Sequence, residues 1–176
     1  MSMADSVRNV RLFVYGSLKH GFSNHEAHCK GLVRFCPAWV EGRIFRLSCG
    51  FPALVLPEGA VLAKGSWNPA KDLELQYLMN AGDPYSRKRR LFPCRASEKW
   101  RRIKGELQIY RDPMLLHSID ALEEYAPGLP SLYERVLTFV HTSPFGVITA
   151  WLYVAGENAG KMDALEVDEW QEGTMI

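Results

Sequence analysis

Residues 10–18 read Val-Arg-Leu-Phe-Val-Tyr-Gly-Ser-Leu, and they carry the strongest strand signal in the chain. The first six residues are β-branched or apolar for the most part and lack a regular polar alternation, which predicts a strand buried on both faces. The strand is expected to stop at Gly16, where a turn begins.

Further strand-like runs follow along the chain, several of them bounded by Gly or Pro. They lie at residues 38–47, 53–56, 103–110, 134–141 and 147–154. Two of these runs carry a glycine in a similar setting, Gly42 and Gly105, and a glycine inside a strand indicates a bulge or a close approach of another backbone. About six short strands with such glycines predict a closed or strongly curved small sheet.

Length and charge narrow the class of protein. The 176 residues suit one domain, and 21 basic against 20 acidic residues leave a net charge of +1. A net charge this close to zero indicates neither an acidic nor a basic partner. We expect no nucleic-acid partner. No apolar run approaches the roughly 20 residues that span a bilayer, and the first residues lack signal-peptide features. A soluble cytoplasmic protein without a membrane partner is expected, with its four cysteines reduced.

A helix is predicted from Asp112, a plausible N-cap followed by Pro113, to about Tyr125. At about 100° per residue, Glu123 lies roughly 50° from the centre of the apolar face and Glu124 roughly 150° from it. Glu123 is therefore expected at the edge of the core and Glu124 in water.

The segment at about 64–102 differs from the rest. Residues 87–104 contain nine basic residues and one acid, so this run carries +8 and the remainder of the chain −7. We expect one domain over residues 1–176 with a basic surface insertion at about 64–102.

The turn after the first strand is the first candidate binding element. Tyr15-Gly16-Ser17-Leu18 is followed by Gly21 and Asn24, and a glycine-containing turn can direct several backbone N–H groups toward a carboxylate or another small anion. A tight turn without a ligand is the alternative. The pattern lacks the Lys-Ser/Thr pair of a phosphate loop, so nucleotide binding is not expected.

Glu123 is the candidate catalytic group. Partial burial disfavours the charged carboxylate and raises the pKa toward neutrality, which suits a general acid or base. An ion-paired or capping glutamate at the rim of the helix is the alternative.

Tyr133 and Arg135 lie on the same face of a predicted strand, because side chains alternate along a strand. A phenol and a guanidinium are therefore candidates for one wall of a pocket, with ordinary cross-strand packing as the alternative. A metal site is not expected, because His20, His25, His28 and Cys29 lack the spacing of a zinc site.

Several short motifs together resemble the gamma-glutamylcyclotransferase-like family, in its short-motif branch that contains gamma-glutamylamine cyclotransferases. They are Phe13-Val-Tyr-Gly-Ser-Leu18, Gly42-x-x-x-x-Leu47 with Phe51-Pro-Ala-Leu54, Gly105-Glu-Leu107, Ile119-Asp-Ala-Leu-Glu-Glu-Tyr125 and Tyr133-Glu-Arg135. The resemblance implies an α+β fold, a small mixed β-barrel flanked by a few helices. It also implies a substrate pocket at the Tyr-Gly-Ser-Leu loop and one essential glutamate, which falls on Glu123. Glu124 stands where the family usually has glycine, and the basic segment has no counterpart in the family's compact core.

The implied reaction converts a gamma-glutamyl amine or gamma-glutamyl amino acid to 5-oxoproline and a free amine, and it needs no metal or coenzyme. We expect Glu123 to transfer the protons, the N–H groups of Gly16, Ser17 and Leu18 to hold substrate, and Tyr15 and Tyr133 to shape the pocket. Asn24 and Arg135 are possible pocket residues, the latter with a structural role as the alternative.

Two other functions compete with this one. The first is a non-catalytic or repurposed fold that binds an acidic partner through the basic insertion. The second is a hydrolase or transferase that acts on a different small substrate in the same pocket.

Overall fold

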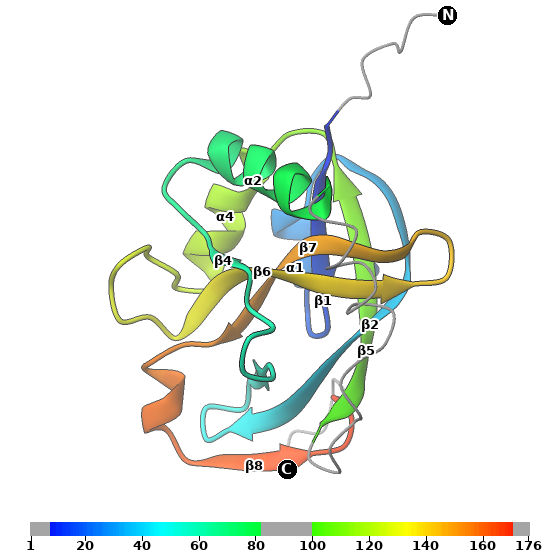
Figure 1. Ribbon diagram of the computed structural model, residues 1–176. Coiled ribbons are helices and arrows are strands. Elements are labelled where there is room, and N and C mark those ends of the chain that lie inside the picture. Colours follow the sequence, from blue (N-terminus) through cyan, green and yellow to red (C-terminus); the bar gives the residue numbers. More distant parts are fainter. Residues whose placement is uncertain (1–7, 82–99, 171–176) are drawn as a thin grey trace, which may run out of the picture.

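A computed structural model describes residues 8–81 and 100–170 of the chain, and these residues form a mixed sheet with helices beside it (Figure 1). The strands are β1 (Val10–Val14), β2 (Leu32–Leu47), β3 (Pro52–Val55), β4 (Ala63–Lys64), β5 (Arg101–Tyr110), β6 (Tyr133–Thr142), β7 (Gly146–Ala155) and β8 (Ala164–Val167). The helices are α1 (Ser23–His28), α2 (Pro69–Ala81), α4 (Leu115–Leu122) and the short 3-10 helix η1 (Ala159–Lys161).

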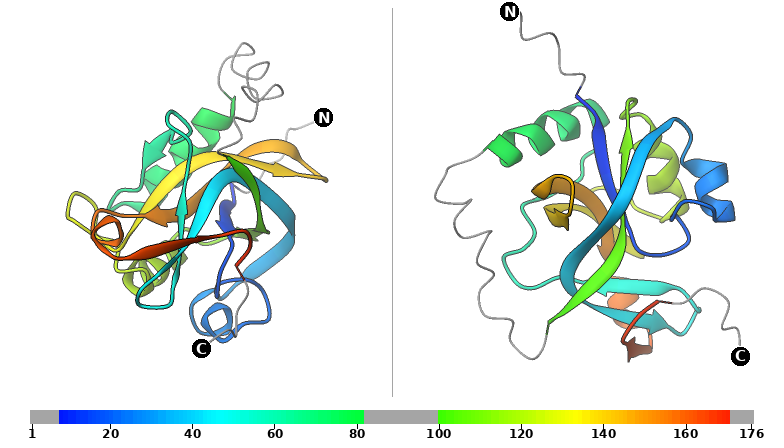
Figure 2. Two further views of the ribbon diagram at one scale, coloured as in Figure 1. Left: turned by 90° about the horizontal axis from the view of Figure 1, so that it is seen from below. Right: turned by 90° about the vertical axis from the view of Figure 1, so that its right-hand side faces the viewer.

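The sheet is strongly curved. Its strand order is β3-β2-β5-β1-β7-β6-β4, with β8 paired to β2, and β2 also pairs with β6. β2 and β5 pair antiparallel over most of their length and curve together (Figure 2). The β2–β6 pairing joins Ala38 and Trp39 to Thr142 and His141, so the path of strands turns back toward its own start. The predicted α+β class and strongly curved mixed sheet are confirmed.

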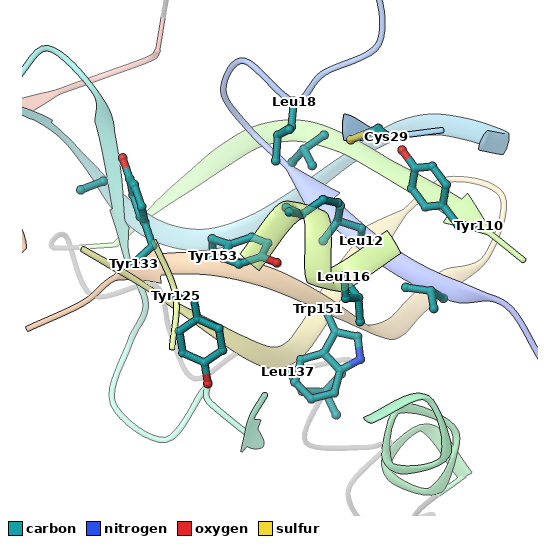
Figure 3. Packing of buried hydrophobic residues seen from close by; sticks show 14 of the residues in the cluster. Leu12, Leu18, Cys29, Tyr110, Leu116, Tyr125, Tyr133, Leu137, Trp151 and Tyr153 are labelled. Atoms are coloured by element: carbon teal, nitrogen blue, oxygen red, sulfur yellow. The ribbon is translucent and has the colours of Figure 1, made fainter. Parts of the chain in front are cut away.

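β1 has a neighbouring strand on each side within this sheet. It pairs antiparallel with β5 and parallel with β7. Val10, Leu12 and Phe13 are each at most 1% exposed. Leu12 belongs to a cluster that also contains Leu116 of α4 and Trp151 of β7 (Figure 3). Both faces of β1 are covered, which explains why its sequence shows no polar alternation.

The two strand glycines mark close approaches. A Cβ on Gly105 would lie 2.7 Å from Cζ of Phe13, and one on Gly42 would lie 2.8 Å from Cδ1 of Leu54. The register along β2 and β5 shifts only between Leu32 and Arg34. Of the two explanations that the sequence allowed, a bulge or a close approach, the close approach therefore applies at both glycines. The absence of a side chain at these positions lets the curved strands approach their neighbours.

Some elements were not expected from the sequence. The first part of β2, residues 32–37, exposes Val33 and Phe35, so it lacks the pattern of a half-buried strand. β4 and β8 contain two and four residues, and α1 contains six. None of the three shows the apolar periodicity by which an element is predicted.

α2 begins inside the expected insertion and packs against the sheet. The side chain of Gln76 is fully buried, its Nε2 donates to the Asn9 carbonyl at 2.9 Å and its Oε1 accepts from the Arg11 N–H at 2.9 Å. The expectation of a surface insertion from about residue 64 is therefore wrong for residues 64–81, because α2 buries polar groups that bind the backbone around β1. Residues 82–99 of that expected insertion lie outside the described residues, and residues 101–102 begin β5.

The predicted helix at 112–125 is shorter in the structure. Asp112 does accept the Met114 N–H at 2.9 Å, but the regular helix α4 begins at Leu115 and ends at Leu122. Glu123 is the C-cap residue, half-buried, and Glu124 is exposed. The predicted difference in exposure between the two glutamates is confirmed.

Across residues 8–81 and 100–170, the structure contains no helix with the length and apolar composition needed to cross a membrane.

Candidate active site

A cavity of about 240 Å³ lies where β1 and α4 end and β6 begins. That volume suits one small molecule. Its described lining residues are Phe13, Val14, Tyr15, Gly16, Ser17, Leu18, Asn24, Phe51, Pro52, Leu122, Glu123, Glu124, Leu132, Tyr133 and Tyr153. The structure thus brings every candidate site residue of the sequence except Arg135 to the walls of one cavity.

The loop after β1 is held from behind. Its Leu18 carbonyl accepts a hydrogen bond from Nε2 of Gln108 at 2.9 Å and lies 3.1 Å from Nδ1 of His25. Because a carbonyl only accepts, the proton of His25 is on Nδ1 in this contact. Asn24 donates to Oγ of Ser17 at 2.8 Å. These side chains fix the conformation of the loop and therefore the directions of its N–H groups.

Two tyrosines brace the cavity walls. The hydroxyl of Tyr15 donates to the Tyr153 carbonyl at 2.9 Å, and that of Tyr133 donates to the Pro52 carbonyl at 2.6 Å. Burial is the main cause that raises the pKa of both phenols above the ordinary range, and the negative charge of Glu123 adds to it. Both phenols remain protonated near neutral pH, so they serve as walls and not as proton carriers.

Glu123 is the group in this cavity with acid–base properties suited to neutral pH. Burial raises the pKa of its carboxyl from 4.5 to about 7, and the negative charge of Asp120 contributes. A carboxyl with this pKa exists in both protonation states near pH 7, which general acid–base catalysis needs.

Arg135 lies outside the cavity wall, in a buried ionic cluster. Its guanidinium is fully buried, with Nε 2.8 Å from Oδ1 of Asp120 and Nη1 2.8 Å from Oδ2 of Asp72. Nη2 also donates to the Ser66 carbonyl at 3.0 Å. Of the two roles that the sequence allowed for Arg135, the structure favours the structural one, since two carboxylates and a carbonyl occupy its donors.

This cluster reaches the cavity through Tyr153. The Tyr153 hydroxyl donates to Oδ1 of Asp120 at 2.6 Å, while the residue itself lines the cavity. Tyr133 and Tyr153 come from the paired strands β6 and β7 (Figure 3). A Cβ on Gly65 would lie 2.7 Å from Cζ of Arg135, so this glycine makes room for the guanidinium. The cluster therefore connects α2, α4 and the two strands behind the cavity.

Sequence reasoning missed Asp72, Asp120 and Tyr153 as parts of this arrangement. A signal was available for the aspartates, because an arginine buried in a strand needs buried carboxylates as partners. Which carboxylates these are depends on the packing of α2 and α4 against the sheet.

The histidines and cysteine between 20 and 29 have other roles. His25 supports the loop, and His28 Nδ1 lies 3.1 Å from Oγ of Ser118. Cys29 is buried, and burial raises the pKa of its thiol to about 11. Within the part of the chain that the structure describes, no three His, Cys, Asp or Glu side chains are grouped to hold a metal ion.

Comparisons with known proteins agree with the motifs. The family model described as "Gamma-glutamyl cyclotransferase, AIG2-like" matches residues 12–96. Among solved structures, the chain is similar to an AIG2-like protein (GGACT) from Mus musculus with a TM-score of 0.54 and 15% identity, over 95% of this chain and 92% of that one. YkqA from Bacillus subtilis aligns with a TM-score of 0.44 and 18% identity, over 86% of this chain and 39% of that one. No curated protein matches the chain.

The matched residues 12–96 include β1 and the loop Tyr15–Leu18, but they end before α4 and Glu123. The structural likeness extends over nearly the whole chain and shows the fold. The chain therefore carries the signature of the AIG2-like gamma-glutamyl cyclotransferases in residues 12–96 and the fold of an AIG2-like protein along 95% of its length, which confirms the family resemblance read from its motifs.

Proposed function

We propose that this protein is a cyclotransferase that converts a gamma-glutamyl amine or gamma-glutamyl amino acid to 5-oxoproline and the free amine. One observation carries the proposal: Glu123, whose pKa is raised to about 7, lines the same small cavity as the loop Tyr15–Leu18. A proton-transferring carboxyl beside a turn rich in N–H groups is what this cyclisation requires.

In the proposed reaction, the Glu123 carboxylate first removes a proton from the α-ammonium of the substrate. The freed amine attacks the γ-carbonyl carbon and forms the ring C–N bond. Glu123 then gives this proton to the departing nitrogen as the original amide C–N bond breaks. The ring nitrogen loses its second proton through the same carboxyl to the released amine, which leaves as an ammonium. The reaction consumes no water, and a single carboxyl returns to its starting state.

The remaining walls are assigned to binding. The N–H groups of Gly16, Ser17 and Leu18 hold the α-carboxylate of the substrate or the oxyanion that develops on the γ-carbonyl. Tyr15 and Tyr133 confine the flexible gamma-glutamyl chain so that its amine faces its own carbonyl. Asn24 acts through Ser17 by keeping the loop in shape.

The test is Glu123→Gln, which keeps the shape of the side chain and removes its proton transfer. The wild type and the variant are incubated with gamma-glutamyl amines and gamma-glutamyl amino acids, and 5-oxoproline is measured by mass spectrometry. We expect a loss of at least about a hundredfold in kcat/KM with an unchanged circular dichroism spectrum. Retained activity in the variant contradicts the assignment of Glu123.

The competing proposal is binding of an acidic partner through the basic run at 87–104. In the described part of that run, Arg101, Arg102 and Lys104 are exposed along β5. It predicts binding that weakens steeply with salt and survives Glu123→Gln. Absence of 5-oxoproline with every substrate would favour it over the cyclotransferase.

A further inference from the structure

Glu124 has an unusual backbone conformation. Its φ is 52°, and it is the one non-glycine residue with positive φ among residues 8–81 and 100–170. The N–H of Glu124 bonds the Ala121 carbonyl at 3.4 Å, and the N–H of Tyr125 bonds the Asp120 carbonyl at 2.8 Å. This is the hydrogen-bond pattern of a Schellman motif, in which the residue after the C-cap is left-handed and is usually glycine.

A glutamate at this position destabilises the backbone conformation relative to glycine. A left-handed conformation disfavours a residue with a Cβ by about 1 kcal/mol relative to glycine. Strain of this kind concentrates at functional sites. Burial in the core does not offset this cost, because Glu124 is exposed.

Glu124 lies where a substrate in the cavity can contact it. It follows Glu123 directly, and both line the cavity. The described lining contains no lysine, arginine or histidine. Phe51, which is 57% exposed, and the half-buried Leu132 add apolar surface. The described lining therefore offers two carboxylates and apolar surface, and no cation to receive a second carboxylate of the substrate.

The geometry of the reaction determines which half of the substrate, the gamma-glutamyl part or the leaving group, lies near Glu123 and Glu124. In the proposed function, on which this inference rests, Glu123 protonates the departing nitrogen. That nitrogen must lie within hydrogen-bond reach of Glu123, and the group that it carries extends from there past neighbouring residues, of which Glu124 is the charged one.

We infer that Glu124 is a specificity-determining residue that favours leaving groups with a positive charge over leaving groups with a carboxylate. An amine that ends in an ammonium group gains attraction to the exposed carboxylate, while the carboxylate of an amino acid is repelled by it and finds no cation on the cavity wall. Because Glu124 is exposed, the discrimination is moderate and depends on salt.

The experiment uses three gamma-glutamyl amides of similar length, made from 1,5-diaminopentane, pentylamine and 5-aminopentanoate. The full-length protein is assayed with each, and the ratio of kcat/KM for the cationic to the anionic amide is the readout. We expect a ratio above one in the wild type that falls about three- to tenfold in Glu124→Gln and shrinks as salt is raised. The Glu124→Gly variant should show the same fall and also unfold at higher urea concentration.

Glu58→Gln is the matched control, because Glu58 is an exposed glutamate that does not line the cavity. It removes the same net charge, and its ratio should equal that of the wild type. Equal ratios in the wild type and Glu124→Gln, or a wild type that prefers the anionic amide, overturn this inference and leave the proposed function standing. A wild type that releases 5-oxoproline from none of the three overturns this inference, and the proposed function falls with it when gamma-glutamyl amino acids also give no 5-oxoproline.

Discussion

Arg135 binds Asp120 through two parallel hydrogen bonds, from Nε to Oδ1 at 2.8 Å and from Nη2 to Oδ2 at 3.1 Å. Asp120 lies one helical turn before Glu123, and its charge contributes to the raised pKa of Glu123. Since Asp72 also binds Arg135, two carboxylates face one guanidinium in the buried cluster. The cluster thus holds the end of α4 in place, and the Asp120 carboxylate within it acts on Glu123.

Asp72→Asn tests the contribution of this cluster to stability. The substitution leaves Arg135 paired with Asp120 but weakens the hydrogen bonds that the Asp72 carboxylate accepts from Arg135 and Ser66, and a hydrogen bond to a charged group is worth about 1.5–3 kcal/mol. Urea denaturation of the wild type and the variant measures the loss. Glu74→Gln on the exposed side of α2 is the control and should change the free energy of unfolding by less than about 0.5 kcal/mol. Equal effects of the two substitutions would contradict the role of the cluster.

The pH dependence of activity tests Glu123 as the base. Because the base must be ionised to accept a proton, kcat/KM is expected to fall as the pH drops below about 7, the pKa of Glu123. A pH–rate profile that stays flat down to pH 5 speaks against this assignment.

Asp120→Asn should shift the acidic limb of the pH–rate profile, which is the fall in kcat/KM at low pH. Removing the negative charge makes the Glu123 carboxylate easier to form, so the limb shifts to lower pH. Far-ultraviolet circular dichroism at each pH checks that the variant is folded. A variant that lowers kcat/KM equally at every pH, with the limb unmoved, would indicate that Asp120 has a structural role alone.

Stability should depend on pH through the same glutamate. Its pKa is about 7 in the folded protein, against 4.5 as the ordinary value, so the folded state holds the proton more tightly than the unfolded state. The resulting stabilisation is present below about pH 4.5 and is lost as the pH rises to about 7. Glu123→Gln lacks this dependence. The free energy of unfolding of Glu123→Gln, relative to that of the wild type, should therefore rise by on the order of 2 kcal/mol between pH 4.5 and 8 in urea denaturation. A difference in this free energy that stays constant with pH would contradict the raised pKa.

Gly105→Ala tests the close approach of β1 and β5. The added methyl group would meet the Phe13 ring and the Val14 carbonyl, both parts of the packed centre. Overpacking of this kind costs about 1–3 kcal/mol or more. Gly160→Ala is the control, because no atom lies within 4 Å of its added Cβ. Thermal denaturation should show a clear loss for the first variant and little change for the second.

Much of the architecture follows from local patterns. The buried character of β1, the strands at 103–110, 134–141 and 147–154, and the opposite exposure of Glu123 and Glu124 all depend on the periodicity of neighbouring residues. The order of the motifs was also enough to identify the family resemblance. Elements without such periodicity, such as β4, β8 and α1, could not be predicted. α2 was missed because its most buried side chains, Asp72 and Gln76, are polar.

Local patterns in the sequence are enough to predict the curved sheet around a buried strand, the turn at Tyr15–Leu18, and a glutamate at the edge of the core. Which residues lie around that glutamate depends on the tertiary packing. Asp72 and Arg135 are 63 positions apart in the chain, and Tyr153 and Asp120 are 33 apart. Their contacts depend on how α2 and α4 pack on the sheet, and burial together with the charge of Asp120 raises the pKa of Glu123. Periodicity reports which face of an element is buried, but it carries no information about which distant charges meet there.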